Sequence, residues 1–266
     1  MKRIFTILPM IIMAFVAKAQ SCPDDNHPHA IDLGLPSGTK WACCNVDTDH
    51  PENQNPTNYG GYYAWGETET KDRYDWNSYI FWNEEENTCH DIGVDIAGTQ
   101  YDVAHVRWGG SWVIPSYDQR NELSNYCTYE WTTENGIEGG KFTSKTNGAS
   151  IFLPGAGFCV DTDVLWSGSV GHYWLSTVSP IGLKLAFRLF FGPDFEVWLD
   201  NDRYTGISVR PVINETNNIN LLKSSTVKTS QTVFNLYGLN VADSISGTST
   251  LRPGIYIVNG KKKVIK

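Results

Sequence analysis

The 266-residue sequence lacks the short motifs by which several classes of enzyme are recognised. It contains no Gly-x-Ser-x-Gly, no His-Glu-x-x-His and no phosphate-binding loop. Their absence removes the sequence evidence for a serine hydrolase with a nucleophile elbow, for a zinc protease and for a P-loop nucleotide hydrolase. Candidate functional residues therefore have to be sought in less distinctive patterns.

Basic residues are also scarce. The chain has 21 Lys and Arg against 29 Asp and Glu, which gives a formal net charge of −8 at pH 7. Nucleic acids and anionic membrane surfaces attract proteins through an excess of basic residues, so we expect neither as the main partner. After the first nineteen residues no apolar run is long enough to cross a membrane, and no transmembrane segment is predicted.

The six cysteines form no Cys-x-x-Cys pair and no cysteine–histidine pair at zinc-finger spacing. In an exported chain we expect one or two structural disulfides and buried thiols for the rest. Cys43 and Cys44 are adjacent, so on a strand their side chains would point to opposite faces. His27-Pro28-His29 offers two imidazoles to a metal ion, but a solvated leader is the favoured interpretation.

The chain begins with the pattern of an export signal. Lys2 and Arg3 precede an apolar run, and Ala17-Lys18-Ala19 has the small-x-small pattern of a cleavage site. This pattern predicts a signal peptide over residues 1–19, followed by a polar leader over residues 20–30. We therefore expect a secreted protein that is associated with the cell surface.

One stretch predicts a helix with particular clarity. Residues 108–116 read Trp-Gly-Gly-Ser-Trp-Val-Ile-Pro-Ser. Ser116 and Gln119 have the spacing of a capping box, which predicts a helix that begins after Ser116. Leu123 and Cys127 are four residues apart and would lie on one face of this helix.

Strand patterns surround that helix. Apolar and polar residues alternate over 183–191, with the period of a half-buried strand. Residues 68–100 are polar and mixed, which indicates a long, loosely structured insertion. Residues 213–231 have the composition of a linker. Residues 232–266 are expected to form a small β module, because Asn259-Gly260 between apolar runs is a strong hairpin signal. One strong helix among many short antiparallel strands and long loops indicates the α+β class.

Several sequence blocks occur in a fixed order along the chain: IDLGLPSGTKWACCNV at 31–46, GYYAWGET at 61–68, AHVRWGGSWVIPS at 104–116, CTYEWTTENG at 127–136, SIFLPGAG at 150–157, GHYWLST at 171–177 and GISVRPV at 206–212. Together they resemble the Fibrobacter succinogenes major paralogous domain, which is abundant in secreted proteins of the Bacteroidetes. The resemblance covers residues 31–212 and implies a C-type-lectin-like fold, related to that of the formylglycine-generating enzyme. It does not imply that enzyme's activity, because no cysteine follows Cys159 to match its copper-binding pair. The calcium-lectin motifs are absent as well.

The end of the chain carries a second resemblance. NLYGLNV at 235–241 and LRPGIYIVNGKKKVIK at 251–266 are similar to the C-terminal sorting signal of the type IX secretion system. This similarity implies recognition by the secretion machinery, export across the outer membrane and attachment to the cell surface. The alternative interpretation of the four lysines is a solvated basic hairpin.

The most distinctive polar cluster runs from Trp198 to Tyr204. Asp200, Asn201 and Asp202 offer oxygen ligands for calcium in a loop expected after a strand, although a plain turn is the favoured interpretation and no metal site is assigned. Trp198 is out of step with its apolar neighbours and is expected to face solvent. An exposed ring beside carboxylates suits a sugar, because the ring covers C–H faces and the acids accept hydroxyl hydrogen bonds. The candidate ligand-binding residues are Trp65, Trp198, Asp200, Asp202, Arg203 and Tyr204.

Other aromatic and titratable residues have competing interpretations. Trp76, Tyr79 and Trp82 would extend a sugar-binding platform or would simply fill the core. His105 and His172 lie in apolar blocks and are expected to be core histidines rather than catalytic bases.

Three functions remain open at the level of sequence. The first is a non-enzymatic binding or adhesion protein for a glycan or a surface protein. The second is a carbohydrate-active hydrolase with paired carboxylates. Its available acids are Glu67, Glu69, Asp200 and Asp202. No spacing selects a pair among them, so no catalytic residue is assigned. The third is a structural, fimbria-like surface subunit.

Overall fold

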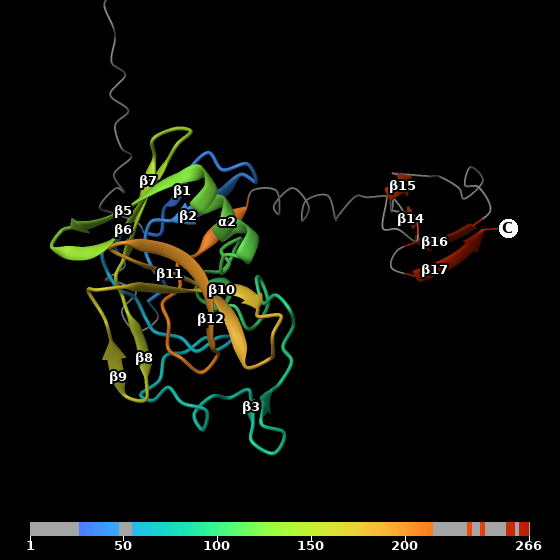
Figure 1. The fold of residues 1–266 in the computed structure, drawn as a ribbon, viewed down its shortest axis with the longest axis horizontal. Helices are drawn as coiled ribbons and strands as arrows, with labels where there is room; N and C mark the ends of the chain where they lie inside the picture. Colours follow the sequence, from blue (N-terminus) through green and yellow to red (C-terminus); the bar gives the residue numbers. More distant parts are fainter. Residues whose placement is uncertain are drawn as a thin grey trace, which may run out of the picture. The chain divides into compact units, whose positions relative to one another are not determined.

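The structure, a computed structural model, describes residues 27–47 and 55–214 and four strands nearer the C-terminus. The chain divides into two compact units, Met1–Glu215 and Thr216–Lys266 (Figure 1). The predicted signal peptide, most of the predicted leader and most of the predicted linker lie outside the described residues. Among the described helices, none has the length and apolar character needed to span a membrane.

A three-stranded sheet joins the two ends of the first unit. Strands β1 (Ala30–Asp32) and β13 (Val212–Asn214) pair antiparallel with the two edges of β2 (Thr39–Ala42). Ile31 and Val212 both lie opposite Trp41. All three side chains are buried, so a slip of one residue would expose them, and the core therefore fixes the register.

A second sheet and one helix form the middle of the unit. Strands β10 (Gly171–Val178), β11 (Leu185–Gly192) and β12 (Phe195–Asp202) pair antiparallel in chain order. Helix α2 (Tyr117–Tyr126) packs on this sheet, as Figure 1 shows. An ion pair between the buried Arg120 of α2 and Glu196 of β12 ties the helix to the sheet.

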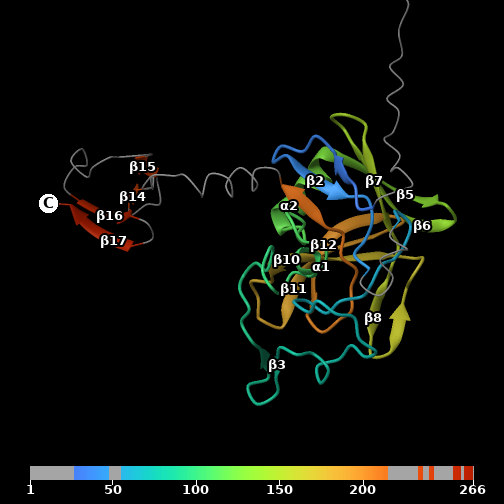
Figure 2. The same ribbon diagram turned by 180° about the vertical axis from the view of Figure 1, so that it is seen from behind.

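The remaining elements are short and mostly paired as hairpins. Helix α2 leads directly into a third sheet, which consists of β5 (Cys127–Glu134), β6 (Ile137–Ser144) and β7 (Ser150–Pro154). Two further hairpins are β3 (Trp82–Asn83) with β4 (Thr88–Cys89), and β8 (Phe158–Val160) with β9 (Asp163–Leu165). Both hairpins lie at the same end of the unit, away from β1 and β7 (Figures 1 and 2). Helix α1 (Val103–Trp108) precedes α2.

The predicted α+β class with one main helix is wrong, because the described part of the chain is β-rich. Small antiparallel sheets supply most of its regular structure, whereas α1 has six residues and α2 has ten. The helical content is low because α2 ends at Tyr126, where the chain passes directly into β5. Segments of alternating polarity then pair with their neighbours through tight turns such as Asn135-Gly136, where Gly136 has a φ of 81°.

The predicted start of α2 is confirmed. The Ser116 side chain accepts a hydrogen bond from the Gln119 backbone N–H at 3.3 Å, and the Gln119 side chain accepts one from the Ser116 N–H at 2.9 Å. This reciprocal arrangement satisfies two N–H groups that the helix itself leaves without partners. Leu123 and Cys127 are both buried, but the prediction that they share a helix face is wrong for Cys127, because α2 ends at Tyr126 and Cys127 begins β5.

Helix α1 was not predicted from the sequence. Its N-cap is the buried Asp102, whose carboxylate accepts hydrogen bonds from the backbone N–H groups of Gly98, His105 and Ile114. Burial raises the pKa of the Asp102 carboxyl, and the backbone donors partly oppose that rise. One side chain thereby fixes α1 against the stretch that leads to α2.

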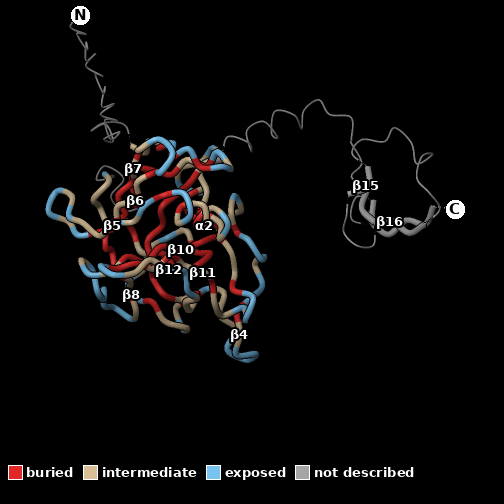
Figure 3. The backbone as a smooth tube through the Cα atoms, turned by 45° about the horizontal axis from the view of Figure 1, so that its top comes forward, coloured by how far each residue is buried: buried red, intermediate tan, exposed pale blue. Residues whose placement is uncertain are grey.

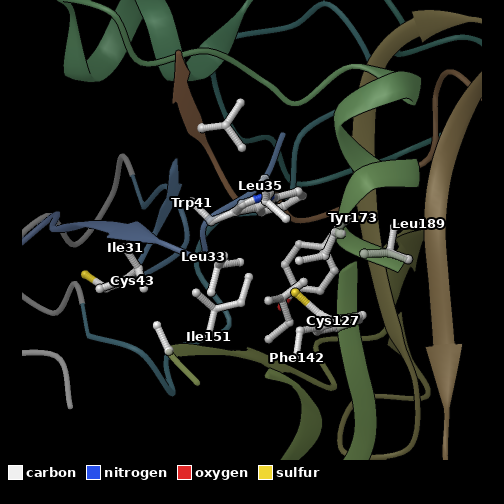
Figure 4. Packing of buried hydrophobic residues seen from close by; sticks show 14 of the residues in the cluster. Ile31, Leu33, Leu35, Trp41, Cys43, Cys127, Phe142, Ile151, Tyr173 and Leu189 are labelled. Atoms are coloured by element: carbon white, nitrogen blue, oxygen red, sulfur yellow. The ribbon is translucent and has the colours of Figure 1, made fainter. Parts of the chain in front are cut away.

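The main hydrophobic core is formed by side chains from the first, second and third sheets and from α2, and buried segments fill the centre of the unit (Figure 3). Figure 4 shows Leu33, Trp41, Phe142 and Tyr173 meeting there. Trp41 and Tyr173 are each only 1% exposed. These side chains come from β2, β6, β10 and the loop after β1, so the core depends on contacts between distant parts of the sequence.

The predicted loose insertion at residues 68–100 is also wrong. Tyr74, Tyr79, Cys89 and Ile96 are buried, and the segment contains the β3–β4 hairpin. The Tyr79 hydroxyl donates to the Trp65 carbonyl at 2.7 Å. The segment is polar on average, but its few buried aromatic side chains are enough to pack it against the rest of the unit.

The cysteines include the buried thiols that were expected, but the expected orientation of Cys43 and Cys44 is not found. Cys89, Cys127 and Cys159 are buried thiols that take part in no disulfide, and Cys22 lies outside the described residues. Burial raises the pKa of the Cys127 thiol to about 11, so this group stays protonated and unreactive at neutral pH. The expected opposite orientation of Cys43 and Cys44 is wrong, because β2 ends at Ala42 and both cysteines lie in a bend.

The second unit contains a four-stranded antiparallel sheet. Its strands are β14 (Val233–Asn235), β15 (Asn240–Ala242), β16 (Gly254–Val258) and β17 (Lys261–Ile265), in the order β15-β14-β16-β17. Val258 pairs with Lys261, which confirms the hairpin predicted from Asn259-Gly260.

Candidate functional site

Two of the predicted ligand-binding residues are in the interior. Trp65 is 1% exposed, and its indole N–H donates to the Leu175 carbonyl at 2.8 Å. Arg203 is fully buried, and its guanidinium lies 4.4 Å from the Trp65 ring centroid. It donates to the Tyr79 hydroxyl and to the Leu183 carbonyl, both at 2.8 Å. The prediction that Trp65 and Arg203 contact a ligand at the surface is therefore corrected: both side chains hold the core together.

The segment predicted to be a plain turn, with a calcium loop as the alternative, is part of a strand. Asp200 and Asp202 belong to β12, where they lie opposite Phe187 and Leu185 of β11. Both aspartates are therefore held in an extended, paired strand and not in a loop that wraps its oxygen ligands around an ion. Among the described residues, no cluster of three potential metal ligands includes either aspartate. Burial raises the pKa of Asp202, and Lys184 partly lowers it.

Trp198 faces solvent, as predicted, with 42% of its surface exposed. The alternation of the strand does not explain this exposure, because Val197 and Leu199 are exposed to a similar extent. Trp198 shares one face of β12 with Asp200, and its ring packs edge-on against Tyr117 at 5.2 Å and Phe187 at 5.3 Å between centroids. The three rings of Tyr117, Phe187 and Trp198 form what we call the Trp198 cluster.

A cleft of about 450 Å³ adjoins the Trp198 cluster. It is lined by Val94, Asp95, Ser116, Tyr117, Asp118, Thr177, Val178, Pro180 and Phe187. These residues come from the start of α2, the end of β10, the middle of β11 and the segment before α1. The cleft therefore depends on the packing of four segments that are distant in the sequence.

Backbone hydrogen bonds hold the walls of this cleft. The Val178 N–H donates to the Val94 carbonyl at 3.0 Å, and the Ile96 N–H donates to the Ser176 carbonyl at 3.0 Å. The Tyr117 N–H, at the start of α2, donates to the Thr177 hydroxyl at 3.2 Å. The wall formed by Val94, Thr177 and Tyr117 is thus fixed before any ligand arrives, which lowers the entropy lost on binding.

The chemistry of the cleft is mixed. Tyr117 and Phe187 offer aromatic surface, while the exposed Asp95 and Asp118 offer carboxylate oxygens. Small-molecule sites are typically concave and largely apolar, with a few polar groups that orient the ligand. Rings together with hydrogen-bond acceptors match a molecule that has both C–H faces and hydroxyl groups.

Tyr204 belongs to a second aromatic group. The Trp76 ring lies 4.7 Å from Tyr204 and 4.5 Å from Trp82, and the Lys184 ammonium lies 4.9 Å from the Trp82 centroid. These rings are partly buried, and Lys184 covers them. Trp76 and Trp82 therefore pack together with Tyr204 in one aromatic cluster. This cluster shares no residue with the Trp198 cluster.

The carboxylates considered for hydrolysis have other partners. Glu67 is buried, forms an ion pair with Lys71 at 2.8 Å and accepts the Ile80 N–H at 3.0 Å. Glu69 pairs with Arg107. Both interactions give these acids a structural role, so neither is offered as a catalytic acid or base.

The two histidines have different surroundings. His172 is 1% exposed and contacts Arg188, which confirms the expectation of a core histidine. His105 is half-buried on α1, where its backbone N–H is capped by Asp102.

No family model, no curated protein and no solved structure matches the chain. The resemblance to the paralogous domain and to the sorting signal therefore remains a prediction. The cleft residues Tyr117, Phe187, Asp95 and Asp118 were missed, because nothing in the local sequence brings them together. A partial signal was present: Phe187 lies in the alternating segment, and Tyr117 is the first residue after the predicted cap.

Proposed function

We propose that this chain is a secreted, cell-surface protein that binds carbohydrate through the Trp198 cluster and the adjoining cleft. The observation that carries the proposal is the meeting of three aromatic rings, one of them 42% exposed, beside a preformed cleft with two exposed aspartates. Trp198 supplies a ring for stacking on a sugar face, and Asp95 and Asp118 accept hydrogen bonds from hydroxyl groups.

The cellular location is part of the same proposal. The N-terminal pattern supports export, and the similarity of the tail to a type IX sorting signal supports attachment at the cell surface. A net charge of −8 is compatible with a neutral sugar ligand and unfavourable for an anionic one.

A glycan array probed with the purified chain tests this function. We expect specific binding that Trp198→Ala weakens by roughly tenfold or more, since central aromatic residues often supply a large part of binding energy. The matched control is Trp166→Ala. Trp166 is 61% exposed in the segment that follows β9, and it belongs neither to the cleft lining nor to the Trp198 cluster.

Chelator and turnover measurements complete the test. Binding should survive a calcium chelator, because Asp200 and Asp202 lie along a strand rather than in a ligand loop. A blank array, or equal loss in the Trp166 and Trp198 variants, would contradict the proposal. Release of reducing sugar by the purified protein would instead favour the hydrolase alternative.

A further inference from the structure

A histidine and two cysteines lie close together beside β1 and β2. The ligand atoms of His27, Cys43 and Cys44 all lie within 4.8 Å of one another. A fourth candidate ligand, the Nδ1 atom of His29, lies 3.8 Å from the Cys43 sulfur. None of these four residues lines the cleft proposed for carbohydrate.

The β1–β2 hairpin brings these residues together. Ala30 pairs with Ala42, so the chain just before β1 lies beside the chain just after β2. The Cys43 N–H donates to the His29 carbonyl at 2.9 Å, which continues the pairing by one residue. Because the bend at Cys43 and Cys44 replaces strand geometry, both sulfurs approach the same imidazole.

The measured separations suit a tetrahedral zinc ion. The distance between His27 Nδ1 and Cys43 Sγ is 3.2 Å, and that between His29 Nδ1 and Cys43 Sγ is 3.8 Å. With Zn–S near 2.3 Å and Zn–N near 2.0 Å, a tetrahedral site places a nitrogen and a sulfur ligand about 3.5 Å apart. Both nitrogen–sulfur separations are close to that value, and the Cys44 sulfur lies within 4.8 Å of the ligand atoms of His27 and Cys43.

Two hydrogen-bond donors lie at Cys43. The His29 backbone N–H donates to the Cys43 sulfur at 3.1 Å. The buried Arg210 donates to the Cys43 carbonyl at 3.0 Å, which places its guanidinium beside the backbone of this bend. Backbone donors to sulfur and a nearby cation both stabilise a coordinating thiolate.

We propose that His27, His29, Cys43 and Cys44 form a binding site for Zn²⁺. Two thiolates and two imidazoles are a donor set that zinc prefers, whereas calcium and magnesium require oxygen ligands. A bound ion would fasten the segment before β1 to the end of β2. The site is independent of the proposed carbohydrate binding, and either can fail without the other.

Metal titration of the purified, reduced full-length chain tests the proposal. We expect one Zn²⁺ per chain, a higher midpoint of thermal unfolding with Zn²⁺, and a sulfur-to-metal charge-transfer absorption when Co²⁺ takes its place. Cys43→Ser should abolish the absorption, and His27→Ala should weaken binding by roughly tenfold to a hundredfold. The matched controls are Cys127→Ser and His90→Ala, which change a cysteine and a histidine elsewhere.

His27→Ala keeps the test decisive if Cys43→Ser does not fold, because His27 is only half-buried. The proposal is overturned if no Zn²⁺ binds, or if the His27 variant binds as tightly as its His90 control. It is also overturned if mass spectrometry of the secreted protein shows Cys43 or Cys44 in a disulfide with Cys22.

Discussion

His172 occupies a position where a charged ring is strongly disfavoured. It is 1% exposed, its ring lies 4.6 Å from Phe190 and 4.8 Å from Phe158, and its Nδ1 faces the Arg188 guanidinium. Burial, with a smaller contribution from Arg188, lowers the pKa of His172 to about 2. The folded protein therefore keeps this imidazole neutral, with Nδ1 free to accept a hydrogen bond from Arg188.

The low pKa of His172 makes folding stability depend on pH. Below pH 6.5 an unfolded chain takes up a proton at this ring and the folded chain does not, so stability is lost as the pH falls from 6.5 towards 2. We expect His172→Phe to flatten this slope by up to about 1.4 kcal/mol per pH unit, as measured by urea unfolding between pH 4 and 7. His90→Phe, at an exposed site, is the control. Parallel curves for His172→Phe and the unaltered protein would contradict the argument.

At the same scale, single side chains show what the sequence can and cannot predict. Alternation with apolar neighbours predicts the exposure of Trp198, but it also predicts buried Val197 and Leu199, which are exposed to a similar extent. The burial of Arg203 is not predicted by any local pattern, because a cation enters the interior only where acceptors and a ring surround it, here the Tyr79 hydroxyl, the Leu183 carbonyl and Trp65. Those partners lie up to 138 positions away, so local sequence contains no trace of them.

Helix α2 depends on its N-cap residue, Ser116. The capping box ties Ser116 to Gln119, and few other features favour a helix of ten residues. We expect Ser116→Ala to lower the free energy of unfolding by about 1 kcal/mol, measured by denaturant titration, because one helix N–H loses its acceptor. Ser116→Gly should cost only a few tenths of a kcal/mol, since glycine is tolerated at this position. A glycine variant as unstable as the alanine variant would show that the cap has another role.

Strand β12 shows how pairing overrides local preference. Asp200, Asn201 and Asp202 have the composition of a turn, and on local grounds a loop was the reasonable prediction. They remain extended because β11 offers a matching partner as far as Leu185, which lies opposite Asp202. Strand propensity reflects this kind of context more than intrinsic preference, so the end of a strand is hard to predict from one sequence.

At the scale of the whole first unit, β13 completes the fold. It pairs with β2, and the Val113 and Val212 backbones exchange hydrogen bonds of 2.9 Å. We expect a chain that ends at Glu215 to unfold cooperatively with an unchanged midpoint. A chain that ends at Arg210 lacks β13 and should lose cooperative thermal unfolding in differential scanning calorimetry, since the core loses the buried Val212 side chain and one edge of β2 is left unpaired. Equal midpoints for the two truncations would show that β13 is dispensable.

The cleft beside Trp198 also arises only at this scale. The sequence predicted the start of α2 and the alternation in β11, but the approach of Tyr117 to Phe187 requires the helix to dock on the sheet. Docking is fixed by buried groups such as Arg120 and Glu196, which are 76 positions apart. Sequence patterns of short period cannot specify such a contact, which is why the aromatic residue at 198 was identified and its neighbours were not.

The sheet formed by β1, β2 and β13 has a consequence for chain connectivity. Because β1 and β13 flank the same four-residue strand, the first unit starts and finishes within a short distance along β2. The order in which the segments are synthesised is then separable from the architecture they build. A short peptide could join Asn214 to Ala30, and new termini could open at the exposed Asn135-Gly136 turn, leaving every sheet of the unit with its present neighbours.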